Sequence, residues 1–364
     1  MTESDRVAEA IAAFRRGEIV VVTDDDDREN EGDLILAAVH ATPEKLGFIV
    51  RHTTGIVCAP LPHETARRLQ LQPMVADNEA PLGTAFTVSV DFKPGLTTGI
   101  SAEERCNTVR ALANPNAGAA EFVRPGHVFP LIARDGGVLM RSGHTEAAID
   151  LCRLAGLEAV GVLAELVNDD GSVMRGADVA RFAEEHTLRR VSVADLIAHR
   201  QRSEVLVERV GEFAVATAAG PARAYAYRTP FDATQHLAVV FGDIGDGRGV
   251  PVRLHREMVA EDVFGVKSGL DRIVARLGGE GRGVIVYLRE GSVGVAEVSA
   301  RTRDNANPAR DSTAGRQSEW REVGLGAQIL RDLGVRSIRL LAGRERRYVG
   351  LEGFGIAIDS TEIV

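Results

Sequence analysis

Apolar residues recur along the chain in two patterns, short runs typical of β-strands and helical spacings of three or four positions. In the first 200 residues the runs that predict strands are 19–23, 34–38, 55–59, 86–90 and 160–163. The segments with helical spacing are 7–16, 43–51, 64–69, 102–113, 145–155 and 176–186. Ser101 and Glu104 have the spacing of a capping box at the start of one of these helices. This alternation predicts an α/β domain with some α+β character.

The pattern is interrupted near residue 200. Ser192 is predicted to cap a short helix that reaches Ile197, and the charged segment 200–204 follows it. We therefore place a boundary there, with a first domain of residues 1–203 and a second of residues 204–364. Beyond the boundary, strands are predicted at 206–217, 222–228, 237–241, 284–288 and 338–342, and a helix at 325–333. The second domain is thus also predicted to be α/β.

The most highly charged segment follows the first predicted strand directly. Its ten residues, 24–33, include seven carboxylates: Asp24, Asp25, Asp26, Asp27, Glu29, Glu31 and Asp33. Because apolar runs flank the segment, we expect a hairpin whose loop is strained by repulsion between like charges. A hard cation such as Mg²⁺ or Mn²⁺ would relieve the repulsion, and a solvated acidic turn is the alternative. Arg28 inside the run favours a phosphorylated substrate, because its guanidinium can bind a phosphate beside the metal ligands.

Overall composition limits the classes of function. The 364 residues carry a net charge of −9, which disfavours nonspecific binding of nucleic acid or anionic membranes. The three cysteines are widely spaced and predict neither a disulfide framework nor a structural zinc site. The N-terminal residues lack the pattern of a signal peptide, and no apolar run approaches the length of a membrane span. We expect a cytoplasmic protein with a small-molecule partner and neither a nucleic acid nor a membrane as partner.

A second polar cluster, 141–146, directly precedes an apolar helical pattern. Free N–H groups at the start of that helix, with Arg141, Ser142 and Thr145, would suit a phosphate. His144 at the same point would suit a metal ion. A capped helix start with no ligand is the alternative interpretation.

Two single residues complete the set of candidates. His127 lies in the segment 124–130, where two prolines and a glycine predict a rigid turn. Glu165 ends the apolar run 160–164. Either residue alone is more often structural than catalytic, so only their conjunction with the acidic run and the 141–146 cluster indicates a site.

Five motifs in a fixed order make the first domain resemble 3,4-dihydroxy-2-butanone 4-phosphate synthase, which forms a four-carbon precursor of riboflavin from D-ribulose 5-phosphate and releases formate. The motifs are Asp26-x-Arg28-Glu29-Asn30-Glu31-Gly32-Asp33, Thr84-Ala85-Phe86-Thr87-Val88-Ser89-Val90-Asp91, Thr98-Gly99-Ile100-Ser101, Gly126-His127-Val128-Phe129-Pro130-Leu131 and Gly143-His144-Thr145-Glu146-Ala147. The resemblance covers about residues 5–200.

The resemblance implies roles for particular residues. Glu29 and His144 would ligate magnesium or manganese, with two ions per site, and zinc is not expected. The residues expected to contact the sugar phosphate are Arg28, Glu29, Asp33, Arg141, Ser142, Gly143, His144, Thr145 and Glu165. The residues expected to be catalytic are His127, Glu165 and Asp33. The resemblance also implies a homodimer with active sites near the subunit boundary.

The chemistry of that reaction agrees with these residue types. Forming an enediol from a ketose phosphate requires a base at carbon and stabilisation of the developing oxyanion. The later dehydration, carbon migration and loss of formate require a Lewis acid on vicinal oxygens. Carboxylates near a metal suit the proton transfers, because their pKa values depend on their mutual repulsion and on the ion.

The second domain resembles GTP cyclohydrolase II in framework, through 252–257, 262–265, 324–330 and 332–335. That enzyme needs three cysteine thiolates for a catalytic zinc, and here the three positions are Met258, Gly269 and Asp271. Loss of GTP hydrolysis is therefore expected, which leaves a stabilising, dimerising or regulatory domain. The alternatives are a bifunctional enzyme that keeps both activities and a regulatory or scaffold protein that has neither.

Overall fold

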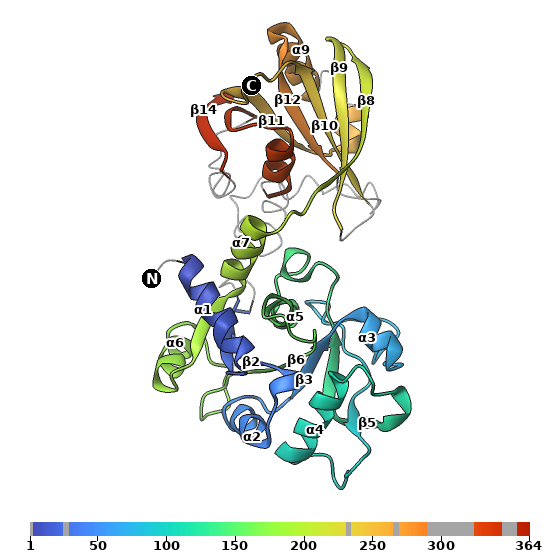
Figure 1. Ribbon diagram of the computed structural model, residues 1–364, viewed down its shortest axis with the longest axis vertical. Helices are drawn as coiled ribbons and strands as arrows, with labels where there is room; N and C mark the ends of the chain where they lie inside the picture. The colour runs from blue at the N-terminus through green and yellow to red at the C-terminus, as the bar shows by residue number, and fades with distance from the viewer. Residues whose placement is uncertain (1–2, 25–28, 231–233, 265–268, 290–323, 344–354) are drawn as a thin grey trace. The chain divides into compact units, whose positions relative to one another are not determined.

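The computed structural model describes residues 3–24, 29–230, 234–264, 269–289, 324–343 and 355–364. The chain divides into two compact units, Met1–His199 and Arg200–Val364, and each is described by itself (Figure 1). Among the described residues, no helix has the length and apolar character that a membrane crossing requires.

The first unit is built around a mixed sheet. Its helices are α1 (Glu3–Arg15), α2 (Pro43–His52), α3 (His63–Arg68), α4 (Ala102–Leu112), α5 (His144–Leu154), α6 (Gly176–Glu185) and α7 (Val193–Ser203). Its strands are β1 (Val20–Thr23), β2 (Gly32–Ala37), β3 (Cys58–Leu61), β4 (Val90–Phe92), β5 (Phe122–Ile132), β6 (Gly161–Glu165) and β7 (Arg189–Ser192). Within the described residues the strand order is β4-β5-β3-β6-β2-β1-β7.

The two faces of this sheet carry different side chains. Leu34 and Leu36 of β2 point into a large apolar core, which includes Leu46 of α2 and Val109 of α4. Because successive side chains of a strand alternate between faces, Asp33 lies on the opposite face. That face is covered by α5, which packs against β2, β3 and β6 (Figure 1). The sheet therefore keeps its main core and its acidic side chains on opposite sides.

Local signals in the sequence account for several helix ends. Ser101 caps α4, because its Oγ accepts a hydrogen bond from the Glu104 N–H at 3.1 Å, and it donates to the Glu104 carboxylate at 2.8 Å. Ser192 likewise accepts from the Asp195 N–H at 3.0 Å before α7. Thr42 precedes Pro43 at the start of α2 and accepts from the Lys45 N–H.

Three predictions for the first unit are wrong in detail. The short helix predicted to reach Ile197 continues as α7 to Ser203, through most of the charged segment. The strand predicted at 86–90 exists only as isolated bridges at Phe86 and Thr87, and regular pairing begins at Val90. The segment around His127, predicted to be a rigid turn, belongs to β5. Pro125 is tolerated in this strand because it lies at an irregularity in the pairing with β4, where a missing N–H costs no ladder bond.

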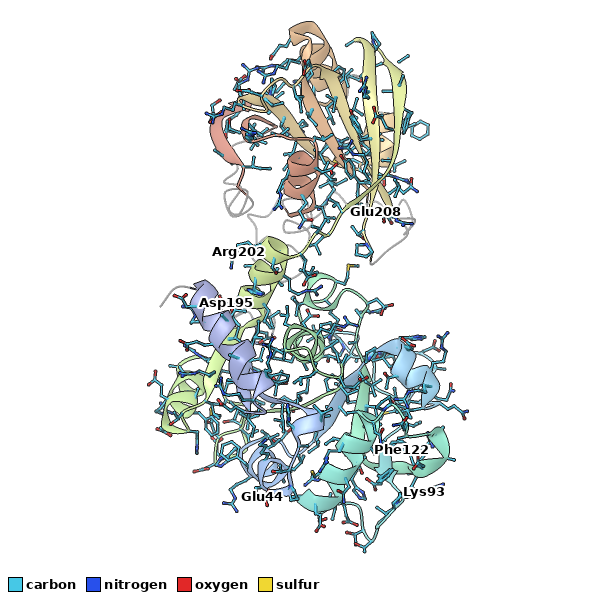
Figure 2. The ribbon with its side chains drawn as sticks, in the orientation of Figure 1. Glu44, Lys93, Phe122, Asp195, Arg202 and Glu208 are labelled. Atoms are coloured by element: carbon cyan, nitrogen blue, oxygen red, sulfur yellow. The ribbon has the colours of Figure 1, made fainter. Side chains whose placement is uncertain are left out.

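The second unit also contains a mixed sheet with helices. Its strands are β8 (Glu208–Thr217), β9 (Gly220–Arg228), β10 (Gln235–Gly242), β11 (Val250–Arg256), β12 (Arg282–Leu288), β13 (Ser337–Ala342) and β14 (Ala357–Ile363). Its helices are α8 (Val259–Phe264), α9 (Gly269–Glu280) and the helical residues 324–332. The described strands are ordered β14-β13-β11-β12-β10-β9-β8. Both units thus have the α/β architecture that the sequence predicts, and Figure 2 adds their side chains to the ribbon.

Candidate active site

The acidic segment forms the connection between β1 and β2, which pair antiparallel with Thr23 opposite Gly32. The Asp24 carboxylate accepts hydrogen bonds from the N–H groups of Glu29, at 3.3 Å, and Glu31, at 3.0 Å. Asp24 therefore holds the backbone of the residues that lead into β2. Arg28, predicted to bind substrate, lies outside the described residues.

The start of α5 meets this hairpin. His144, the first residue of α5, is buried, and its Nδ1 lies 3.7 Å from Asp33 Oδ1 and 3.9 Å from Glu29 Oε2. Ser142 and Thr145, on either side of His144, are buried as well. The structure thus brings together side chains that are more than 100 positions apart in the sequence.

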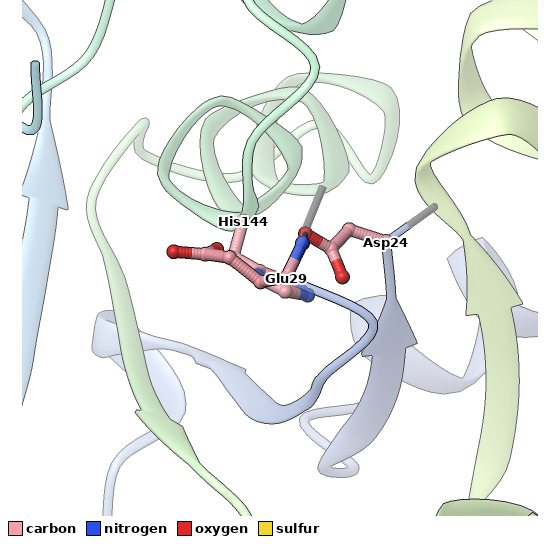
Figure 3. Close-up of side chains that lie close together, drawn as sticks. All are labelled: Asp24, Glu29 and His144. Carbon is pink, nitrogen blue, oxygen red and sulfur yellow. Dashed lines mark hydrogen bonds and ion pairs between the residues drawn. The ribbon is translucent and has the colours of Figure 1, made fainter. Parts of the chain in front are cut away.

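Three of these side chains have the arrangement of a metal site. One potential ligand atom from each of Asp24, Glu29 and His144 lies within 4.8 Å of the other two. Figure 3 shows the three side chains converging from the β1–β2 connection and from α5. Two carboxylates and an imidazole suit a divalent cation such as Mg²⁺ or Mn²⁺. Glu29 and His144 were predicted as ligands, and the structure adds Asp24 to them.

Asp33 is a buried acid beside this group. Burial raises the pKa of its carboxyl well above the usual value, and the negative charges of Glu165, Glu29, Asp24 and Glu31 raise it further. Its Oδ1 atom is buried and has no hydrogen-bond partner among the described residues. An added positive charge or a ligand hydroxyl would therefore be stabilised at this atom. The residues present fit a bound cation.

Glu165 faces Asp33 directly across two neighbouring strands, since β2 and β6 pair antiparallel with these residues in register. The Thr54 hydroxyl donates a hydrogen bond to Glu165 Oε2 at 2.8 Å. The Thr54 N–H also donates to the Glu165 carbonyl oxygen, at 2.9 Å. Two bonds from one residue therefore hold both the backbone and the carboxylate of Glu165.

Arg141 is fixed in the loop before α5. Its guanidinium donates to Glu146 Oε2 at 2.7 Å and to Thr84 Oγ1 at 3.1 Å. Glu146 is buried and also accepts from the Arg134 N–H at 3.0 Å. Gly143 lets the guanidinium come close, because a Cβ atom there would lie 2.5 Å from Arg141 Nη1 and displace it. The loop therefore presents a positioned cation beside the α5 N-terminus.

His127 lies elsewhere on the sheet. In the strand order, β3 and β6 separate β5 from β2, which places His127 about 14 Å from Asp33 at the usual strand spacing. His127 contacts Asp91 of β4, with Nδ1 2.7 Å from Asp91 Oδ2. Of the three residues predicted to be catalytic, the structure thus joins Asp33 and Glu165 and places His127 apart.

Sequence reasoning gave no role to Asp24, Thr54 or Asp91. Asp24 was one of seven carboxylates in the run, and only its position directly after the strand distinguishes it. Asp91 ends one of the five motifs, so a signal was present in the sequence. Thr54 carried no signal, because its function depends on a long-range contact with Glu165.

In the second unit, none of the three residues at the positions of the GTP cyclohydrolase II zinc ligands carries a thiolate. Met258 is partly exposed before α8, and Gly269 and Asp271 lie in the first turn of α9. His255 Nε2 lies 2.9 Å from Asp262 Oδ1, and Glu257 pairs with Arg289 at 3.1 Å. Asp24, Glu29 and His144 are the group of three potential metal ligands found in the described part of the chain.

Each half of the chain matches the model of a known protein family. The family model for 3,4-dihydroxy-2-butanone 4-phosphate synthase matches residues 8–199, and that for GTP cyclohydrolase II matches residues 208–363. The riboflavin biosynthesis protein RibBA of Salinispora arenicola is 48% identical, over 98% of this chain and 88% of its own. Two chloroplastic proteins of Arabidopsis thaliana are each 47% identical over 97% of this chain. They are the bifunctional riboflavin biosynthesis protein RIBA 1, of which 67% is covered, and the monofunctional riboflavin biosynthesis protein RIBA 2, of which 75% is covered.

Two solved structures are similar as well. RibBX from A. baumannii, a two-domain 3,4-dihydroxy-2-butanone 4-phosphate synthase, has a TM-score of 0.85 and 36% identity, with 99% of this chain and all of that chain covered. A 3,4-dihydroxy-2-butanone 4-phosphate synthase in complex with two magnesium ions has a TM-score of 0.53 and 46% identity, with 54% of this chain and 97% of that chain covered.

Proposed function

The chain belongs to the 3,4-dihydroxy-2-butanone 4-phosphate synthase family and is an enzyme of riboflavin biosynthesis, and from that premise we propose that it converts D-ribulose 5-phosphate to 3,4-dihydroxy-2-butanone 4-phosphate and formate. The observation that carries the proposal is the cluster at which Asp33, Glu165 and the Asp24–Glu29–His144 group meet. Release of formate from D-ribulose 5-phosphate by the purified protein, with Mg²⁺ supplied, tests it.

Glu29 and His144, with Asp24, would hold a divalent ion, magnesium or manganese, and two ions per site are proposed because a related structure contains two magnesium ions. Such an ion supplies a Lewis acid for negative charge that develops on the sugar oxygens. Asp24 and Glu29 contribute the carboxylate oxygens that hard cations prefer. Zinc is not part of the proposal.

The side chains of the protein transfer protons and bind the phosphate. Asp33 is suited to proton transfer with a substrate oxygen, because burial and the neighbouring carboxylates raise its pKa in the metal-free protein. Glu165, fixed by Thr54 on the facing strand, is suited to take the proton from the carbon next to the carbonyl group. Arg28, Arg141, Ser142, Gly143 and Thr145 bind the phosphate, for which the α5 N-terminus offers backbone N–H groups and the positive end of the helix dipole.

We propose a homodimer in which two chains share each active site. His127 is separated from Asp33 by two strands, although both are proposed to be catalytic. Ile100 next to the His127–Asp91 pair, Leu82 beside Arg141, and Ile56 before β3 are exposed apolar side chains of the first unit. We propose that these side chains are buried against a second chain and that His127 of the partner subunit completes the Asp33 cluster.

Subunit complementation tests the shared site. Glu29→Gln and His127→Ala proteins should each be inactive. The mixture of dimers formed on co-expression should recover about a quarter of the wild-type activity, because about half of the dimers are heterodimers and each heterodimer contains one intact site of two. No recovery in a verified heterodimer would place His127 and Glu29 of one chain in the same site.

We propose that GTP cyclohydrolase II activity is lost. The support is chemical, because methionine, glycine and aspartate replace the three thiolates that a catalytic zinc requires. Overall similarity does not decide the matter, since a bifunctional and a monofunctional relative are equally identical to this chain. Formate release from GTP, measured with and without Zn²⁺, distinguishes a single-function enzyme from a bifunctional one. We also propose that the protein acts in the cytoplasm.

A further inference from the structure

The strand that carries His127 is irregular where the histidine lies. Val90 of β4 pairs with Val128 of β5, whereas the next residue, Asp91, pairs with Val123. The four residues 124–127 therefore have no partners in β4 and form a bulge. Bulges beside active sites re-aim a side chain that a regular strand would point elsewhere.

Two side chains close this bulge, from Asp91 of β4 and from Ser89 directly before β4. Ser89 Oγ accepts a hydrogen bond from the Gly126 N–H at 3.1 Å. Asp91 Oδ1 accepts from the His127 N–H at 2.9 Å, and Asp91 Oδ2 lies 2.7 Å from His127 Nδ1. Asp91 thus contacts the histidine twice, once at the backbone and once at the ring, whereas Ser89 contacts only the backbone.

The surroundings hold this pair tightly. Asp91 is buried, while the side chain of His127 is 41% exposed. Gly99 packs on both residues, because a Cβ atom there would lie 2.2 Å from Asp91 Oδ2 and 2.7 Å from His127 Nδ1. Its φ of +83° is also a conformation that favours glycine. Arg105 of α4 is the buried cation that interacts with Asp91: burial lowers the pKa of Arg105, and the charge of Asp91 opposes that effect.

We propose that Asp91 is a positioning residue, which fixes the ring of His127 in one orientation and in the tautomer that carries its proton on Nδ1. An ionised carboxylate can only accept hydrogen bonds, so Nδ1 must donate. The exposed remainder of the ring then offers Nε2 as an acceptor for a substrate proton. This inference rests on the catalytic role proposed above for His127.

Asp91→Asn tests the inference at nearly constant volume. The amide oxygen can still accept from the His127 N–H, but the amide nitrogen then faces Nδ1 and donates to it, so the ring proton must move to Nε2. We expect kcat to fall about 100-fold or more, with KM changed by no more than about threefold, because general acid–base catalysis contributes factors of that size. In 15N-histidine NMR spectra, the two ring nitrogens of His127 should exchange their protonation states.

Ser89→Ala is the matched control. It removes the other side-chain bond that closes the same bulge and leaves the ring contact in place. We expect its kcat to stay within about threefold of wild type, since the contact between Asp91 and the His127 ring is unchanged. An equal loss of kcat in both variants would show that Asp91 only closes the bulge, and an unchanged His127 tautomer in Asp91→Asn would overturn the proposal.

The catalytic role of His127 and the effect of Asp91 on its tautomer can be tested independently. If wild-type protein releases no formate from D-ribulose 5-phosphate, or if His127→Ala keeps full kcat, the proposed function or the role of His127 fails. The NMR comparison of wild type with Asp91→Asn needs no turnover, so it still decides whether Asp91 sets the tautomer. His127→Gln identifies the His127 signals by their loss.

Discussion

Asp33 and Glu165 lie directly opposite each other on two antiparallel strands, and the Asp33 side chain is almost completely buried. Like charges in such a pair destabilise a sheet. The pKa of Asp33 is raised, first by burial and then by the facing Glu165, because both disfavour the ionised carboxylate. The fold therefore tolerates an unfavourable contact at the place where the proposed reaction needs proton transfer.

Replacing Asp33 should make the metal-free protein more stable at neutral pH. Because the pKa of Asp33 is raised in the folded state, the native protein binds more protons than the unfolded chain above about pH 3.8, so stability is lost as the pH rises from there. Asp33→Asn removes this loss, and we expect a gain of about 1 kcal/mol at pH 7. The gain should vanish near pH 3.5, which thermal unfolding in EDTA at both pH values measures.

Asp170→Asn is the control for this experiment, because Asp170 is an exposed carboxylate in a turn. Its effect on the melting temperature should not follow the pH dependence of Asp33→Asn. A lower melting temperature for Asp33→Asn at pH 7 would mean that the ionised carboxylate is stabilised in the fold, contrary to its environment. Enzyme activity should be lost in Asp33→Asn and kept in Asp170→Asn.

A divalent ion should stabilise the wild-type protein without any substrate. Binding to the native state alone stabilises by about 2.7 kcal/mol when the free ion is at 100 times its Kd. Glu29→Gln removes one ligand charge, so it should start from a higher melting temperature in EDTA and gain much less from Mg²⁺. The two denaturation curves should therefore change order as Mg²⁺ is added. Equal gains in both proteins would exclude Glu29 as a ligand.

The extent of prediction from sequence differs between the fold and the site. Most helices are found within one or two residues of their predicted ends, because apolar spacing and caps such as Ser101 are local signals. β5 was missed, since its two prolines and a glycine indicated a turn. The structure explains the discrepancy, because Ser89 and Asp91 supply bonds that a regular ladder would otherwise provide.

The arrangement of the site could not be predicted from local sequence patterns. Glu29, Asp33 and His144 could be named because their motifs resemble those of a known family, not because periodicity brings them together. The contacts that orient the proposed catalytic groups, Thr54 on Glu165 and Asp91 on His127, join residues 111 and 36 positions apart. No local pattern in a single sequence encodes such pairs, so these were found only in the structure.

Thr54→Val should lower turnover with little effect on stability. The valine keeps the shape of threonine but cannot donate to Glu165 Oε2, while the backbone bond from residue 54 to the Glu165 carbonyl remains. We expect kcat/KM to fall about tenfold, which corresponds to about 1.4 kcal/mol in the barrier. Steady-state kinetics on D-ribulose 5-phosphate measure this. Thr54→Ser should restore most of the activity, and its failure to do so would point to a packing role for the threonine methyl group.

Glu146→Gln should weaken substrate binding more than it slows the chemical step. Glu146 is buried and holds Arg141 at 2.7 Å, so a neutral amide leaves the guanidinium with a weaker anchor beside the proposed phosphate site. We expect KM to rise about tenfold with kcat within about threefold, and a loss of about 2 kcal/mol in the free energy of unfolding, because a buried charge pair is broken. Glu184→Gln, on the exposed side of α6, is the matched control and should change neither quantity. An unchanged KM in Glu146→Gln, with the loss of stability present, would show that Arg141 braces the loop and does not bind the phosphate.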